Sequence, residues 1–170
     1  MIATGQRDEV HRLARENPGE ALKKALVIEV PWFRAQALSH VARFTDGDPV
    51  AIASEAAEAA TQCDDEYKRT AVRTWEIAAL ARRGYLDEAR TALTEALASS
   101  KTVTPPSSHA EALMLLQRAA FSIDHASAKL VAIEVESTVD ASLHWRCKRA
   151  KRYSGEMLSR EFKKHNYFYR

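Results

Sequence analysis

The sequence predicts an all-α protein, a right-handed α–α superhelix of about five stacked helical hairpins. Alanine supplies much of the apolar content, because 46% of the residues are hydrophobic while only 8% are aromatic. Alanine is the strongest helix former, and its small side chain lets helices approach closely. Small apolar residues also recur at helical spacing after each turn-forming break, and the pattern repeats. We therefore expect a single helical-repeat domain over residues 1–170 and almost no β-strand.

Turn-forming residues divide the chain into ten expected helices, paired as hairpins. These helices cover about residues 5–16, 18–29, 32–44, 49–62, 66–83, 86–99, 108–121, 124–137, 139–153 and 156–165. A tail, 166–170, follows the last helix, and 102–108 is the longest expected loop.

Capping residues justify the boundaries of the middle helices. Pro31 suits a first helical turn, where a missing N–H costs nothing. Asp48 is expected to cap the helix that follows it, and Asp64 or Asp65 the next one. Gly84 is expected to end the helix that begins at about Glu66.

A second capping signal marks the helix expected after the long loop. Ser107 or Ser108, followed by Glu111, forms a Ser-x-x-Glu capping-box pattern. This pattern predicts that the helix begins at about residue 108.

Aligned positions give the repeat interval. In the second helices of the hairpins, columns 37 residues apart contain Ile52, Ala89 and Ala126; Ala56, Leu93 and Leu130; and Ala59, Ala96 and Ile133. In the first helices, one column with intervals of 38 or 39 contains Arg34, Arg73, Glu111 and Arg149. Several columns in phase indicate a structural repeat.

The segment 84–97, GYLDEARTALTEAL, resembles the second half of a tetratricopeptide repeat. It has that family's glycine at the turn, followed by alanine, a large apolar residue and alanine at Ala89, Leu93 and Ala96. The resemblance extends over most of 10–137, with intervals of 37 to 39 residues where the family has about 34. It implies an α-solenoid that binds a protein or peptide, with the first helix of each hairpin lining the concave face.

Charge is distributed unevenly along the chain. The full sequence has 25 basic and 23 acidic residues, of which nine basic and two acidic residues lie in 141–170. The remaining 16 basic and 21 acidic residues make 1–140 net negative by five charges, whereas 141–170 is net positive by seven. The basic end is expected to form a capping hairpin at about 139–170.

Arg34, Arg69 and Arg73 are the candidate partner-binding residues on the expected concave face. The planar guanidinium recognises carboxylates through paired hydrogen bonds, so these arginines favour an acidic peptide or a terminal carboxylate. The alternative is that they lie on exposed helix faces and pair with nearby Glu or Asp.

The basic end carries a second candidate site. Its core consists of Arg146, Lys148, Arg149, Lys151 and Arg152, with aromatic residues on both sides. Basic side chains neutralise phosphates and aromatic rings stack on bases, so RNA or single-stranded DNA is one candidate ligand. An anionic membrane surface, an acidic protein partner and a purely structural cap are the other interpretations.

No catalytic or metal-binding motif is present in the sequence, so we expect no enzyme activity, no catalytic residues, no metal and no cofactor. Cys63 and Cys147 lack metal-ligand spacing and are expected to be reduced thiols. The charged N-terminal segment does not resemble a signal peptide, and no apolar run approaches the ~20 residues that span a bilayer. We therefore expect a cytoplasmic binding scaffold, with homodimerisation left open.

Overall fold

The computed structural model describes residues 2–140 and 142–159, and this part of the chain is all-α, with nine helices and no strand. The helices are α1 (Ala3–Leu13), α2 (Pro18–Leu26), α3 (Pro31–Phe44), α4 (Pro49–Thr61), α5 (Glu66–Arg82), α6 (Leu86–Ser100), α7 (Pro106–Ile123), α8 (His125–Asp140) and α9 (Trp145–Ser159). The predicted all-α class is confirmed.

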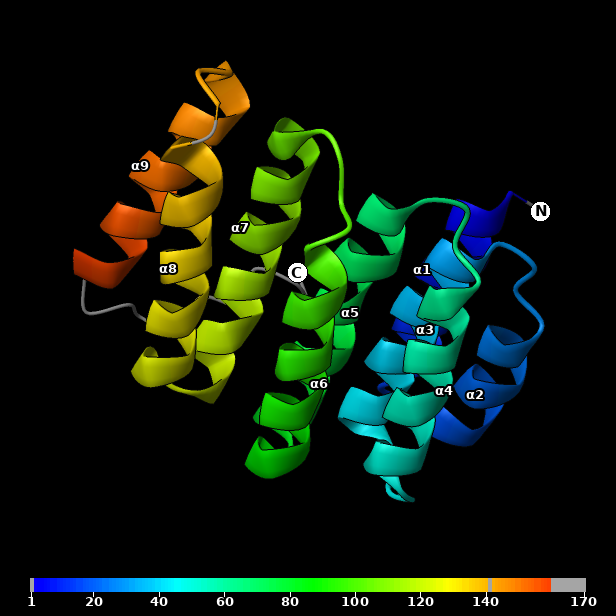
Figure 1. The fold of residues 1–170 in the computed structure, drawn as a ribbon. Coiled ribbons are helices and arrows are strands. Elements are labelled where there is room, and N and C mark those ends of the chain that lie inside the picture. Colours follow the sequence, from blue (N-terminus) through cyan, green and yellow to red (C-terminus); the bar gives the residue numbers. More distant parts are fainter. Residues whose placement is uncertain (1, 141, 160–170) are drawn as a thin grey trace.

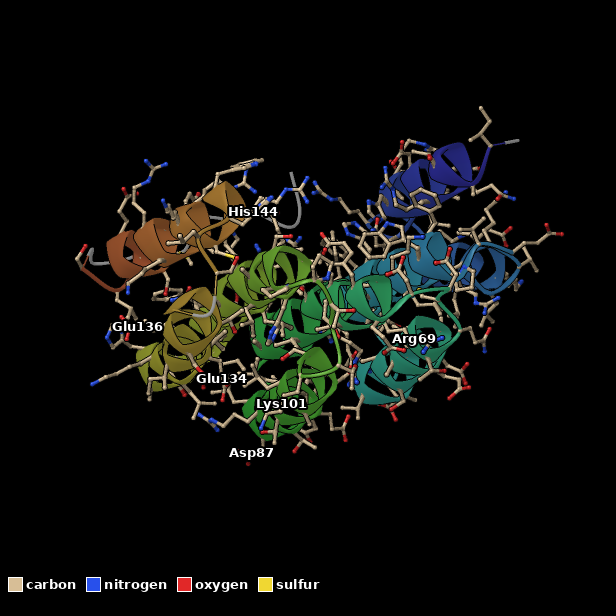
Figure 2. All side chains as sticks on the ribbon, turned by 45° about the horizontal axis from the view of Figure 1, so that its top comes forward. Arg69, Asp87, Lys101, Glu134, Glu136 and His144 are labelled. Carbon is tan, nitrogen blue, oxygen red and sulfur yellow. The ribbon has the colours of Figure 1, made fainter. Side chains whose placement is uncertain are left out.

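The helices form two rows (Figure 1). The odd-numbered helices make the first row, in which each helix packs against the next, from α1 to α9. The even-numbered helices make the second row, and each of them packs mainly against its two neighbours in the first row. In Figure 2 the two terminal helices of the first row, α1 and α9, lie above its middle members, so this row is the inner side of a curved array.

Small side chains make the contacts between the rows. Alanines at helical spacing are fully or almost fully buried, for example Ala21 and Ala25 in α2 and Ala89 and Ala96 in α6. Larger apolar side chains fill the space between first-row helices, and Leu38, Ile77, Leu113 and Leu116 are at most 1% exposed. Alanine at the crossing points allows close packing, which explains why so few aromatic residues are needed.

The expected turns in the middle of the chain are confirmed. Pro31 opens α3 at its first position. The side chain of Asp48 caps α4 by accepting hydrogen bonds from the amides of Val50 and Ala51, at 2.9 and 3.1 Å. Asp65 caps α5. Gly84 follows the end of α5 with φ of +86°, a conformation that residues with a Cβ adopt only at a cost.

The capping box predicted before α7 is wrong. The helix begins at Pro106, and its N-cap residue, Pro105, has no side-chain hydrogen bond to the helix. Ser107 and Ser108 therefore lie in the first turn. Proline is favoured at the first helical position because its φ angle is already helical and no N–H is lost there.

The expected break near residue 154 is also wrong. α8 extends to Asp140, and α9 passes through Ser154 and Gly155 without interruption. A single glycine costs only about 1 kcal/mol within a helix, and the burial of Ser154 and Met157 anchors both sides of Gly155. The remainder of the expected final helix and the tail 166–170 lie outside the described residues.

The buried face of α8 differs from the predicted one. Leu130 and Ile133 are 53% and 60% exposed, whereas Ala128, Val131, Ala132 and Val135 are buried. The buried positions follow Ala89, Leu93 and Ala96 at an interval of 39 residues, so the 37-residue alignment displaced α8 by two positions. Two residues rotate a helix by about 200°, which exchanges its inner and outer faces.

A pair of stacked histidines, His40 buried and His11 half-buried, lies between α1 and α3. The rings of His11 and His40 stack with their centroids 4.1 Å apart. Burial lowers the pKa of His11 to about 4, with Arg7 contributing, and that of His40 to about 3, with His11, Arg43 and Arg15 contributing. Both imidazoles are therefore neutral in the folded protein near pH 7.

Candidate functional site

A groove with a volume of about 590 Å³ lies between α4 and α6, above α5. We call it the α4–α6 groove. One wall consists of the α4 residues Val50, Ala53, Ser54, Ala57, Glu58 and Thr61. The opposite wall consists of the α6 residues Asp87, Glu88, Thr91, Ala92 and Glu95. The α5 residues Arg73, Glu76 and Leu80 complete the lining.

Helical periodicity explains why these side chains share one surface. Thr91 and Ala92 lie three and four residues after Glu88, and four and three residues before Glu95, so all four lie on a single face of α6. Arg73, Glu76 and Leu80 follow the same rule on α5. The groove forms because α4 and α6 both pack against α5, whose side chains occupy the space between them.

An ion-pair network lies at the base of the groove. Arg73 Nε donates to Glu76 Oε2 at 2.5 Å, and Arg73 Nη2 donates to Glu76 Oε1 and Glu95 Oε2, both at 3.0 Å. The side chains of Arg73 and Glu76 are only 13% and 6% exposed. Burial raises the pKa of the Glu76 carboxyl against the opposing effect of Arg73. The network fixes α6 to α5 and neutralises part of the groove's negative charge.

Two carboxylates on the rim are left without a counter-charge. Glu58 on α4 and Glu88 on α6 are exposed, and neither forms an ion pair with any residue that the structure describes. Asp87, by contrast, pairs with Arg90 at 2.8 Å. The lining contains five carboxylates and one guanidinium, so the groove favours a positively charged occupant.

The three predicted partner-binding arginines do not converge on one site. Arg34 donates to the carbonyl oxygen of Ile28 at 3.2 Å and to the side chain of Gln62. Arg69 donates to the carbonyl oxygen of Cys63 at 2.8 Å and to the carboxylate of Glu66 at 2.5 Å. Only Arg73 lines the groove.

These contacts agree with the alternative interpretation, in which the arginines bind groups of their own chain. Arg34 and Arg69 each reach the turn region at an end of a second-row helix, α2 or α4. A guanidinium with several donors is suited to the unpaired carbonyls of a helix end. Contact between these three arginines and a partner stays a prediction.

The predicted basic residues of the C-terminal region lie on α9. Arg146, Lys148, Lys151 and Arg152 are exposed, while Arg149 is half-buried and pairs with Glu111 of α7. Glu111 and Arg149, which occupy the same aligned position in two neighbouring predicted repeats, therefore pair with each other. The basic surface of α9 is separate from the groove, because α9 packs against α7 and α8.

An aromatic residue accompanies the basic surface. Trp145 opens α9 and is 58% exposed. The guanidinium groups of Arg146 and Arg149 lie 5.5 and 5.1 Å from the centroid of its ring, within the range of cation–π attraction. This arrangement holds the indole at the surface with one face next to positive charge.

The described residues contain neither a metal-ion cluster nor a membrane-spanning helix. Among residues 2–140 and 142–159, no group of three or more His, Cys, Asp or Glu side chains is placed to bind a metal ion. Within the same residues, no helix combines the length and the apolarity that crossing a lipid bilayer requires.

The carboxylates of the groove, above all Glu58, Glu76, Glu88 and Glu95, were not predicted from the sequence. Glu88 and Glu95 share a helix and are seven residues apart, but acidic residues at helical spacing usually mark only a solvated face. These carboxylates form a candidate site because they line the open space between α4 and α6. That space depends on how the helices pack together, which the sequence does not show.

Comparisons with known proteins do not identify the chain. No protein-family model matches it, and no curated protein or solved structure is significantly similar to it. The resemblance to tetratricopeptide repeats therefore stays a prediction.

Proposed function

We propose that this protein is a non-catalytic helical-repeat scaffold that binds a positively charged segment of a partner protein in the α4–α6 groove. The observation that carries the proposal is the pair of exposed carboxylates, Glu58 and Glu88, which face the groove from opposite walls without a counter-charge among the described residues. A peptide with lysine or arginine side chains would supply two missing cations at once.

The remaining lining supports a peptide ligand in particular. The half-buried side chains of Val50 and Ala57 present apolar surface in the groove, and Ser54, Thr61 and Thr91 add hydroxyl groups. Peptide-binding grooves combine apolar contact, which provides affinity, with a few polar groups that orient the ligand. The volume of about 590 Å³ accommodates several side chains of such a segment.

The proposal changes the expected chemistry of the partner. The sequence favoured an acidic peptide, because the candidate residues were arginines. Arg34 and Arg69 donate to groups of this chain, and Arg73 lies among five carboxylates. The charge of the groove therefore supports a basic partner in place of an acidic one.

A direct binding experiment tests this function. A synthetic amphipathic helix of lysine and leucine, labelled with a fluorophore, serves as the probe and is titrated with the protein at about 0.1 M salt. Glu58→Lys with Glu88→Lys is expected to weaken binding about tenfold or more, because like charges replace both attractive pairs.

The matched control has the same change in net charge away from the groove. Glu55→Lys with Glu136→Lys replaces two exposed glutamates that do not line it. This variant is expected to bind the probe nearly as well as the wild type. Equal losses in the two variants would show that only net charge attracts the probe, and the proposed function would then be wrong.

Nucleic-acid binding through α9 is a second candidate function, favoured by the exposed side chains of Trp145, Lys148 and Arg152 on one helix. The measurement is the affinity for a labelled single-stranded RNA at several salt concentrations. A steep fall with salt, and loss of binding in Lys148→Glu with Arg152→Glu, would support this function. Unchanged binding in that variant would exclude α9 as the site.

A further inference from the structure

The exposed face of α9 has the chemistry that the α4–α6 groove lacks. Trp145, Lys148 and Arg152 are spaced by three and four residues, so they lie along one stripe of the helix. All three are exposed, and neither Lys148 nor Arg152 forms an ion pair with a described residue. We call these three residues the α9 stripe.

We infer that the α9 stripe of one molecule docks into the α4–α6 groove of a second copy of this chain. This inference rests on the proposed function, since it names the occupant of the same groove. Among the residues that the structure describes, the groove presents two carboxylates without an ion-pair partner, Glu58 and Glu88, and the stripe presents two such cations, Lys148 and Arg152. The exposed tryptophan next to these cations matches the apolar surface that Val50 and Ala57 present in the groove.

The pairing occurs between molecules because the fold keeps the two surfaces apart within one molecule. α9 packs against α7 and α8 at one end of the array, whereas the groove lies between α4, α5 and α6 in the middle (Figure 1). In Figure 2, Asp87 of the groove lies at the outer edge of the second row, and His144, next to Trp145, lies on the side of the first row. α9 would have to leave α7 and α8 to reach its own groove.

The charge of the whole sequence points in the same direction. Residues 1–140 are net negative by five charges and residues 141–170 net positive by seven, so one molecule carries opposite charges in its two parts. Each copy then attracts the next copy through unlike surfaces.

A one-way contact, in which only one stripe enters the groove of the other molecule, is heterologous and leaves one groove and one α9 stripe open. We therefore expect chains of molecules whose length increases with protein concentration. Because the attraction involves exposed charges, high salt is expected to shorten these chains.

Two charge-reversed variants provide the test. The groove variant contains Glu58→Lys and Glu88→Lys, and the stripe variant contains Lys148→Glu and Arg152→Glu. All four positions are exposed, so helical content measured by circular dichroism is expected to match that of the wild type. Sedimentation velocity at about 0.1 M salt, on nuclease-treated protein, measures association.

The inference predicts that the wild type exceeds its monomer mass of 19.0 kDa as concentration rises. Each variant alone is expected to associate at least about tenfold more weakly than the wild type, because its groove and its stripe carry charges of the same sign. An equal mixture of the two variants is expected to regain association, because each groove then meets a stripe of opposite charge.

Three results would overturn the inference: a wild type that stays monomeric at every concentration, a mixture that associates no better than its components, or association that disappears with nuclease treatment. Failure here is distinguishable from failure of the proposed function. If the wild type stays monomeric while the lysine–leucine probe still binds in a manner sensitive to Glu58 and Glu88, the groove has a different basic partner.

Discussion

Arg73 donates two hydrogen bonds to the buried carboxylate of Glu76, at 2.5 and 3.0 Å, on the base of the α4–α6 groove. Arg73 is three residues before Glu76 on the same helix and also pairs with Glu95 on α6. The same guanidinium thus stabilises a buried charge and joins two helices of the groove.

Removing this guanidinium is expected to destabilise the fold. Arg73→Met leaves the Glu76 carboxylate buried without a cation, at a cost of about 3 kcal/mol in the free energy of unfolding. Urea unfolding measures the loss. Arg73→Met combined with Glu76→Leu removes both charges and is expected to regain most of the stability, so a double variant as unstable as the single one would contradict this explanation.

The His11–His40 pair predicts acid sensitivity. The folded-state pKa values, about 4 for His11 and about 3 for His40, lie below the ordinary value of 6.5. Between pH 6.5 and these values, the unfolded chain therefore binds more protons than the folded protein. Stability is therefore greatest above pH 6.5 and falls as pH decreases towards 4, by at most about 1.4 kcal/mol per pH unit for each histidine.

Unfolding free energies measured between pH 6.5 and 5 test the role of the histidines, because most carboxylates stay ionised there. His11→Phe with His40→Phe retains two stacked rings without a titrating group. This variant is expected to show a flatter dependence on pH over the range. An unchanged slope would assign the acid sensitivity to other groups.

The cap of α4 predicts a local effect on one groove wall. Asp48→Ala removes the acceptor of two amide hydrogen bonds and is expected to cost about 1 kcal/mol of stability. Asp46→Ala is the matched control, because Asp46 is exposed in the same turn and has no hydrogen bond to a described residue. Thermal unfolding of the two variants is the measurement, and similar melting temperatures would refute the role of the cap.

The register of α8 predicts different effects at neighbouring positions. Val131→Ala creates space in the core and is expected to cost about 2 kcal/mol, whereas Leu130→Ala changes an exposed side chain and is expected to cost less than about 0.5 kcal/mol. Chemical unfolding compares them. A larger loss at Leu130 would support the 37-residue alignment and contradict the buried face described above.

The sequence predicted those features of the fold that depend on neighbouring residues. Asp48, Asp65 and Gly84 define helix ends through contacts or backbone angles within a few residues. The register of α8 was predicted wrongly, because an alignment of alanines does not distinguish intervals of 37 and 39 residues. Burial of Val131 and Val135 depends on how α8 packs against α7 and α9.

The residues of the candidate site were harder to predict than the helix ends, because their contacts depend on tertiary structure. Arg34 reaches Gln62, and Arg73 reaches Glu95, across 28 and 22 residues of chain. No local pattern shows that these arginines have partners within the molecule. The groove itself exists because α4 and α6 lie on either side of α5, which spacing along one helix does not show.

The location of a bound ligand tests the central claim most directly. Amide chemical shifts of isotopically labelled protein, recorded during titration with the lysine–leucine probe, report which residues contact it. If the probe binds in the groove, the largest changes are expected at groove residues of α4 and α6, including Ala57, Glu58, Glu88 and Thr91. Changes confined to residues outside the groove would contradict the claim.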